Sequence, residues 1–189
     1  MNKKLLATIL LSLVLITSLL VIILPTIFTK NISRIKLNKS IDLELILNDE
    51  KDIKIIFFGY SSCSDICSPR LEMLGKFYST LDEKIKKRVG VEFLDISSPS
   101  DMTLPNRFAK YFNNEFKGIY LDKKVMRNYT KEFNVYFAQS LLDKSEYNHT
   151  TNIYLVKKNN NLKLLKYIYN SYPYDFEQMN LDIVSLLNE

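Results

Sequence analysis

The stretch that decides the fold is Ile53–Leu81, IKIIFFGYSSCSDICSPRLEMLGKFYSTL, where a strand pattern changes to a helix pattern around two cysteines. Residues 53–59 are mostly apolar, β-branched or aromatic, which is typical of a strand buried on both faces. From Pro69 onward, apolar residues recur at three- and four-residue steps, as on one face of a helix. The junction of the two patterns holds the only cysteines of the chain, Cys63 and Cys67.

The rest of the chain predicts an α/β domain with a mixed sheet flanked by helices. Early strands that alternate with helices predict a parallel core, and a late hairpin predicts an antiparallel edge. This is the thioredoxin-like plan, and we assign it to residues 41–189 as one domain. The further strands are expected at 41–47, 89–95, 116–121, 134–141, 150–156 and 162–169, the further helices at 104–112, 123–133 and 174–187, and the hairpin turn at 157–161.

The N-terminal segment predicts a membrane anchor. No charged residue occurs between Leu5 and Phe28, and a helix of that length rises about 36 Å, enough to cross a hydrocarbon core of about 30 Å. We therefore expect an uncleaved transmembrane helix within residues 1–29 and a tether at 30–40. Lys3 and Lys4 precede the apolar run, which predicts a cytoplasmic N-terminus and an exported domain.

A cleaved signal peptide is the alternative interpretation of this segment. Its apolar core is normally about 7–15 residues long and is followed by small residues at a cleavage site. The present run is longer, and no clear A-x-A sequence follows it.

The net charge of +5 does not by itself indicate an anionic binding partner. The basic run at 84–88, KIKKR, ends a predicted helix, where cations are favoured by the helix dipole. A solvated helix end explains this run better than a patch for an anionic partner does. An exported domain also does not suit a nucleic-acid-binding role.

The two cysteines stand where the buried strand ends and the helix begins. Ser62 is a candidate N-cap of that helix, and Asp65 three residues later supplies a first-turn carboxylate, as in a weak capping box. A helix N-terminus stabilises a thiolate, so we expect a thiol pKa below the free value of about 8.5. A lowered pKa favours a nucleophile or a metal ligand.

The Cys-x-x-x-Cys spacing bears on whether the two thiols form a disulfide or bind a metal. On a helix, positions i and i+4 have Cβ atoms about 5–6 Å apart, whereas a disulfide needs about 3.8 Å, so a bridge would distort the first turn unless Cys63 lies outside the helix. Two thiolates can instead bind a soft metal such as Cu(I) or zinc, and they are too few for an iron–sulfur cluster. A structural disulfide is the alternative, although it would close a short loop and contribute little entropy.

His149 is the only histidine of the chain and directly precedes the strand predicted at 150–156. In the thioredoxin-like plan, the loop that enters this strand lies against the turn that carries the cysteines. A lone histidine is commonly just a surface residue, but here it is predicted to lie beside the two sulfurs. Two thiolates and one imidazole suit copper, whereas zinc would require a fourth ligand.

The segment from Phe57 to Cys67, FFGYSSCSDIC, resembles the F-G-[YF]-[TS]-x-C-P-D-[IV]-C-P signature of the Sco/SenC family. Members are membrane-anchored, thioredoxin-like copper chaperones that help to build the dinuclear copper centre of cytochrome c oxidase. The resemblance implies that Cys63, Cys67 and His149 bind copper, as Cu(I) or Cu(II), and that Asp65 supports the motif. The loop FLDISSPSD also resembles a loop of the family, which implies supporting roles for its two carboxylates, Asp95 and Asp101.

The chain departs from the family pattern in ways that remove no ligand. Ser64 and Ser68 replace the two motif prolines, and the arginine of the loop after residue 95 is missing. These changes indicate a divergent member, whose copper client need not be the usual oxidase.

Two functions from different classes follow. The first is a metallochaperone, not an enzyme, whose partners are the copper-site subunit of cytochrome c oxidase or another copper client, and a thiol reductant. The second is a thiol–disulfide oxidoreductase that acts on cysteines of an oxidase subunit or another exported protein, with Cys63 attacking and Cys67 resolving the mixed disulfide. His149 distinguishes the two functions, because thiol exchange needs no third ligand.

Overall fold

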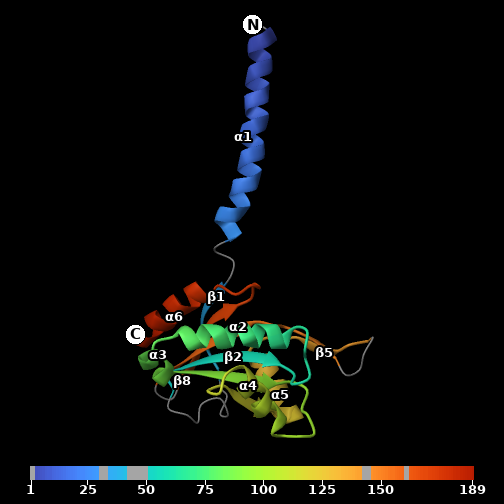
Figure 1. Cartoon of the computed structure of the whole chain (residues 1–189), viewed down its shortest axis with the longest axis vertical. Coiled ribbons are helices and arrows are strands. Elements are labelled where there is room, and N and C mark those ends of the chain that lie inside the picture. Colours follow the sequence, from blue (N-terminus) through green and yellow to red (C-terminus); the bar gives the residue numbers. More distant parts are fainter. Residues whose placement is uncertain (1–2, 30–33, 42–50, 142–145, 160–161) are drawn as a thin grey trace.

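A computed structural model describes residues 3–29, 34–41, 51–141, 146–159 and 162–189. It contains one long N-terminal helix and an α/β domain (Figure 1). The elements are α1 Lys3–Thr29, β1 Arg34–Ser40, β2 Ile53–Gly59, α2 Cys67–Thr80, α3 Glu83–Arg88, β3 Val89–Asp95, α4 Leu104–Phe112, β4 Lys117–Tyr120, α5 Lys123–Glu132, β5 Phe137–Gln139, β6 Tyr147–His149, β7 Ile153–Asn159, β8 Leu162–Tyr169 and α6 Phe176–Asn188.

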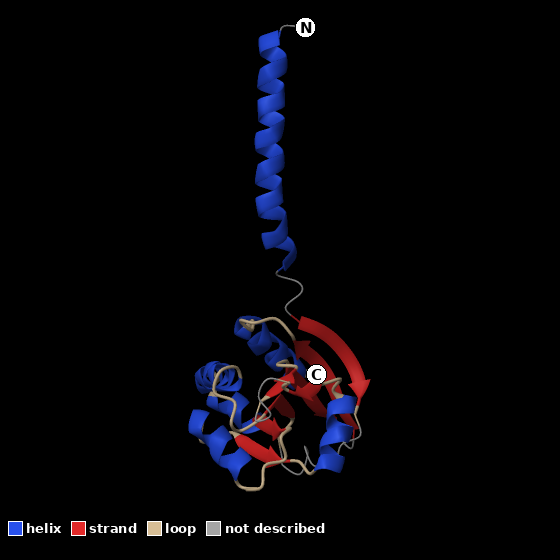
Figure 2. Ribbon diagram, turned by 90° about the vertical axis from the view of Figure 1, so that its right-hand side faces the viewer, coloured by secondary structure: helices blue, strands red, loops and turns tan. Residues whose placement is uncertain are grey.

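A six-stranded mixed sheet forms the centre of the domain, with strand order β1-β8-β7-β2-β3-β4. The neighbours β2, β3 and β4 run parallel, whereas β7 is antiparallel to both β2 and β8, and β1 is antiparallel to β8. Both the parallel core and the antiparallel edge predicted from the sequence are confirmed. A separate two-stranded sheet, β5-β6, precedes β7; Figure 2 shows the strong curvature of the main sheet.

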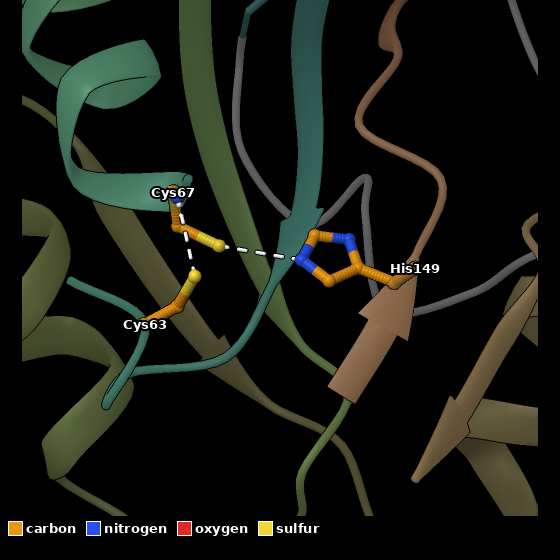
Figure 3. Close-up of side chains that lie close together, drawn as sticks. All are labelled: Cys63, Cys67 and His149. Carbon is orange, nitrogen blue, oxygen red and sulfur yellow. Dashed lines mark hydrogen bonds between the residues drawn. The ribbon is translucent and has the colours of Figure 1, made fainter. Parts of the chain in front are cut away.

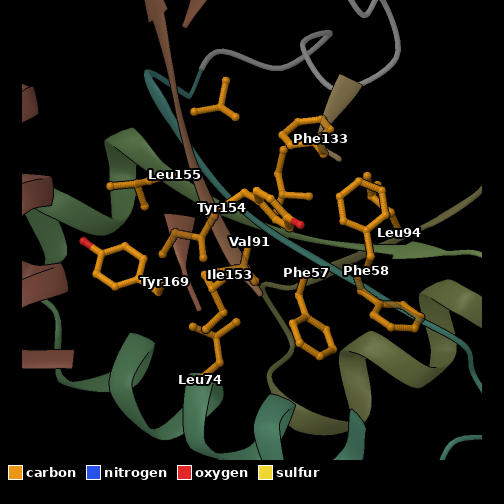
Figure 4. Packing of buried hydrophobic residues seen from close by; sticks show 14 of the residues in the cluster. Phe57, Phe58, Leu74, Val91, Leu94, Phe133, Ile153, Tyr154, Leu155 and Tyr169 are labelled. Carbon is orange, nitrogen blue, oxygen red and sulfur yellow. The ribbon is translucent and has the colours of Figure 1, made fainter. Parts of the chain in front are cut away.

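Every residue of strand β2 is buried. Because consecutive side chains point to opposite sides of the sheet, the strand contributes to the core on both faces. On one side, Phe57 stacks with Phe93, with ring centroids 6.5 Å apart. On the other side, Phe58 contacts Phe133 and Tyr154, at 5.3 and 5.6 Å between ring centroids. Figure 4 shows Phe57 on one side of the strand and Phe58, with Phe133 and Tyr154, on the other. Each large apolar side chain buried in this way stabilises the fold by about 1.5–3 kcal/mol.

The segment predicted as a tether is partly a strand. Residues 34–40 form β1, which pairs with β8, so the tether predicted at 30–40 was wrong over this range. The Arg34 guanidinium makes an ion pair with Asp182 of α6 and lies 5.0 Å from the centre of the Tyr167 ring. These contacts fix the start of the domain to elements near the other end of the chain.

Other boundaries differ from the sequence predictions in smaller ways. The helix expected through Leu81 ends at Thr80, and the basic run at 84–88 belongs to a separate helix, α3, whose Asp82 cap accepts a hydrogen bond from the Lys84 N–H at 2.7 Å. The strand expected at 134–141 is reduced to 137–139, paired with β6 rather than with the main sheet. The strand expected at 41–47 lies outside the described residues from position 42 onward.

Helix α1 is long and apolar enough to cross a membrane, by length and composition, over Lys4–Leu24. None of that span is buried inside the protein. A membrane anchor and an N-terminal signal sequence both account for such a helix.

One buried ion pair lies in the sheet, between β2 and β3. Lys54 Nζ donates to Glu92 Oε1 at 2.8 Å, and the two residues are 1% and 3% exposed. Removing one partner of such a buried pair is costly, because the remaining charge loses its counter-charge at 2.8 Å and stays buried.

Lys54→Met is therefore expected to lower the free energy of unfolding by about 3–5 kcal/mol, while Lys54→Met/Glu92→Leu recovers most of that loss. Urea denaturation of the full chain in detergent measures both. The control is Lys76→Met, which removes the exposed Lys76–Glu72 pair at 2.7 Å and should cost less than about 1 kcal/mol. Equal losses for Lys54→Met and Lys76→Met would contradict the prediction.

Candidate metal centre

The two cysteines lie on the connection between β2 and α2. After Gly59 the chain makes a turn in which the Cys63 N–H donates to the Tyr60 carbonyl at 3.0 Å. Helix α2 begins only at Cys67, so Cys63 lies outside the helix. The distance of about 5–6 Å between the Cβ atoms of helical residues i and i+4 therefore does not apply to this pair. Cys63 is 5% exposed and Cys67 is fully buried. Both are free thiols rather than a disulfide.

The capping box expected from the sequence is not formed. Ile66 occupies the N-cap position of α2 and makes no side-chain hydrogen bond there, while Ser62 is exposed. Asp65 accepts a hydrogen bond from the Ser64 hydroxyl at 2.6 Å and points to solvent. The prediction failed because the turn after β2 delays the start of the helix beyond the reach of Ser62.

The sulfur of Cys63 takes the place of a capping oxygen. The Cys67 N–H donates to Cys63 Sγ at 3.3 Å, so one of the otherwise unsatisfied N–H groups at the helix start is directed at the sulfur. The Ser68 hydroxyl donates to the Cys63 carbonyl at 2.9 Å and ties the same residue to the helix. Ser68 was identified in the sequence only as a departure from the family motif; its contact with Cys63 could not be read from the pattern.

His149 ends β6 and faces the two sulfurs (Figure 3). Its Nε2 lies 3.4 Å from Cys67 Sγ. Its Nδ1 lies 2.9 Å from the Thr150 carbonyl, which can only accept, so Nδ1 carries the proton and the Nε2 lone pair points toward the sulfurs. The ring also packs edge-on against Tyr60, with centroids 5.8 Å apart. The expectation that the late histidine lies against the early cysteines is confirmed.

The three side chains fit a shared metal ion. Cys63 Sγ, Cys67 Sγ and a ring nitrogen of His149 all lie within 4.8 Å of one another. Two sulfurs bound at about 2.3 Å to one ion lie at most about 4.6 Å apart, so a small adjustment of the side chains brings all three donors into range. Thiolates and imidazole form a soft donor set, suited to copper or zinc.

The pKa values of the two thiols are shifted in opposite directions. The pKa of Cys63 is lowered, first by the hydrogen bond from the Cys67 thiol and also by hydrogen bonds from the N–H groups of Cys67 and Ile66. The pKa of Cys67 is raised, because its thiol donates to Cys63 and because it is buried. Without metal, Cys67 therefore holds its proton more tightly than Cys63 does.

Gly59 is required by the close approach of Cys67. A Cβ atom at this position would lie 2.8 Å from Cys67 Sγ and 2.9 Å from the Phe93 ring. The glycine at the end of β2 thus lets the sulfur lie against the strand backbone.

A buried carboxylate holds the cysteine loop in place. Asp95 is fully buried at the end of β3. Its Oδ2 accepts from the Ser61 N–H at 2.9 Å and from the Ser61 hydroxyl, and its Oδ1 accepts from the Ser97 N–H and hydroxyl at 2.7 and 2.5 Å. Asp95 therefore joins the cysteine loop to the loop that follows β3.

The other carboxylate carried over from the family, Asp101, lies away from the cluster. It is exposed and accepts from the Thr103 N–H at 2.9 Å, and it makes an ion pair with Arg107 at 2.6 Å. These contacts stabilise the start of α4 rather than the metal centre.

The comparisons with known proteins agree on one family. Residues 50–184 match the family model of SCO1/SenC. SCO2-like proteins of Rickettsia conorii and Rickettsia felis are each 27% identical, over 132 and 133 residues. These matches cover 66% and 67% of this chain and 63% of each relative, so the chain spans less than two thirds of the curated relatives it matches.

Solved structures show the same fold. Apo Sco1 of Thermus thermophilus has a TM-score of 0.63 and 22% identity, covering 81% of this chain and 92% of its own. Copper-bound yeast Sco1 has a TM-score of 0.57 and 22% identity, covering 73% and 77%. Copper-bound ScoI of Bradyrhizobium japonicum has a TM-score of 0.59 and 20% identity, covering 73% and 86%.

Alkylation of the reduced, metal-free chain should occur at Cys63 well before Cys67. Because the pKa of Cys63 is lowered, its iodoacetamide rate should stay nearly constant from pH 8 down to pH 6. An ordinary thiol with a pKa of about 8.5 loses about tenfold in rate per pH unit there. Fragmentation mass spectrometry identifies the modified residue, and Cys63→Ser supplies the slow Cys67 rate as a control. An ordinary pH profile at Cys63 would refute the assignment.

Ser61→Ala and Ser97→Ala each remove one hydroxyl from Asp95 and should each cost about 1.5–3 kcal/mol of stability. Only Ser61 lies on the cysteine loop, so only Ser61→Ala should slow alkylation of Cys63 at pH 7. The two variants serve as controls for each other, by urea denaturation and by alkylation rate. If both slow the reaction equally, Asp95 does not position the cysteines through Ser61.

Proposed function

The chain belongs to the SCO1/SenC family, and on that basis we propose that it is a membrane-anchored copper chaperone that delivers copper for assembly of the copper centre of cytochrome c oxidase. Copper is the cargo of such a protein rather than a resident cofactor. The acceptor is the copper-site subunit of the oxidase or another copper client.

The observation that carries the proposal is the convergence of Cys63, Cys67 and His149, whose donor atoms lie within 4.8 Å of one another. Within the described part of the chain, this cluster contains no fourth histidine, cysteine, aspartate or glutamate. Two thiolates and one imidazole suffice for Cu(I), whereas structural zinc is bound by four ligands. The SCO1/SenC assignment and the copper-bound relatives from yeast and Bradyrhizobium japonicum support the same metal.

The state of the thiols supports reversible loading. The pKa of Cys63 is lowered and that of Cys67 is raised, so the proton released when Cu(I) binds would come chiefly from Cys67. The cluster lies at the end of the sheet, where Cys63 retains some exposure, so the metal can exchange without unfolding of the domain.

The anchor is the remaining part of the proposal. We place α1 as an uncleaved single span, with Lys3 and Lys4 on the cytoplasmic side and the domain on the exported side. This arrangement would hold the copper-loaded domain at the membrane in which an oxidase is assembled.

A thiol–disulfide oxidoreductase is the second candidate, favoured by one observation. A Cys63 thiolate beside a Cys67 thiol suits attack on a client disulfide followed by resolution. The client would be left reduced and the Cys63–Cys67 pair oxidised, and a thiol reductant would have to restore it.

A Cu(I) titration of the reduced chain separates the candidates. We expect one Cu(I) per chain, a loss of affinity of about tenfold or more in His149→Ala, and no tight binding in Cys63→Ser/Cys67→Ser. The neighbouring Asn148→Ala is the control and should bind like the wild type. Unchanged binding by the double cysteine variant would end the chaperone proposal. Disulfide reduction that is insensitive to His149→Ala, in a chain that binds no copper, would favour the oxidoreductase.

A further inference from the structure

A pocket of about 200 Å³ opens beside Cys63. Its walls are Tyr60, the loop 62–66 and the segment 146–148. Of the three cluster residues, Cys63 alone lines this pocket. It therefore gives small groups from solvent a route to the cluster from the Cys63 side.

The other two donors do not line this pocket. Cys67 is fully buried, with its sulfur against the end of β2. The ring of His149 is half-buried, packs on Tyr60 and is held by its Nδ1 hydrogen bond to the Thr150 carbonyl. A group that enters through this pocket therefore reaches a bound ion beside Cys63.

The mouth of this pocket is acidic. Asp65 from the cysteine loop and Glu146 from the segment before β6 both line it and are both exposed. Among the lining residues that the structure describes there is no lysine or arginine, although the chain as a whole has a net charge of +5. The remaining lining groups are hydroxyl, amide, aromatic or apolar. The two carboxylates place negative charge at the mouth of the pocket, which favours a positively charged group there. The Arg70 guanidinium does not line the pocket; it donates to the Ile66 carbonyl at 3.1 Å.

We propose that this pocket is the entry for the metal-accepting side chain of the client, and that this side chain lies in a basic segment. The inference rests on the proposed copper-chaperone function. A thiolate or imidazole of the acceptor forms a bond to copper as the bond from copper to Cys63 breaks. Copper remains Cu(I), no electron is transferred, and Cys63 is released as a thiolate. Cys67 and His149 hold the ion until a second acceptor ligand replaces them.

The charge preference of the pocket can be measured without copper. The reduced, metal-free full chain in detergent is treated with two methanethiosulfonates of similar size, one with a trimethylammonium group and one with a sulfonate. We expect the cationic reagent to be favoured at Cys63 beyond its preference for a small free thiol. Asp65→Asn/Glu146→Gln should lower that preference by about fivefold at low salt, and less at high salt, because two nearby charges are removed.

The matched control is Glu72→Gln/Glu177→Gln, which makes the same change in net charge at two exposed positions outside this pocket. It should leave the reagent preference within about a factor of two of the wild type, since exposed charges farther away are screened. An equal effect of the two double variants, or a wild-type preference no greater than that of a free thiol, would overturn the inference.

Copper transfer provides the second measurement. Two synthetic acceptor peptides carry the same cysteine pair, flanked by lysines in one and by glutamates in the other. The lysine peptide should take Cu(I) from the wild type several-fold faster, and Asp65→Asn/Glu146→Gln should remove the difference without losing its one Cu(I). Equal transfer rates from the wild type would overturn the inference. Absence of Cu(I) binding in the wild type would instead defeat the proposed function and leave the reagent measurement valid.

Discussion

The hydrogen bond from the Cys67 N–H to the Cys63 sulfur, at 3.3 Å, is the interaction on which the metal centre depends. It makes the first cysteine the cap of the helix that begins with the second. The hydrogen bond between the two thiols lowers the pKa of Cys63 and raises that of Cys67, and the Cys67 N–H adds to the lowering at Cys63. A disulfide, a bound soft metal and a shared proton are then alternative ways of satisfying the same two sulfurs.

This geometry is held by contacts from three separate parts of the chain. Gly59 lets the Cys67 sulfur lie against β2, and the buried Asp95 at the end of β3 fixes the loop through Ser61. His149 comes from the short β5-β6 sheet, with its Nδ1 occupied by the Thr150 carbonyl. The pocket beside Cys63 gives access to this cluster, which suits a protein that has to release what it binds.

The sequence predicted elements well where burial gives a regular pattern. Strands 53–59 and 89–95 and helix 104–112 are found where they were expected, because their apolar spacing is local. Strand β1 was missed because its sequence, RIKLNKS, is polar and mostly exposed, and its stability comes from pairing with β8 far along the chain. The Ser62 cap was wrongly predicted because the length of the turn after β2 depends on hydrogen bonds to Asp95 and Tyr60.

By itself, the sequence determined the chemistry that is available: two thiols spaced by three residues at the end of a buried strand, one imidazole, and an apolar N-terminal helix. Only the tertiary structure decided that the imidazole, 82 residues after Cys67, lies 3.4 Å from its sulfur. It also decided which thiol holds the proton and which side of the cluster is open. Residue types and periodicity are properties of near neighbours, whereas these features depend on strand register and on loops brought together from distant parts of the chain.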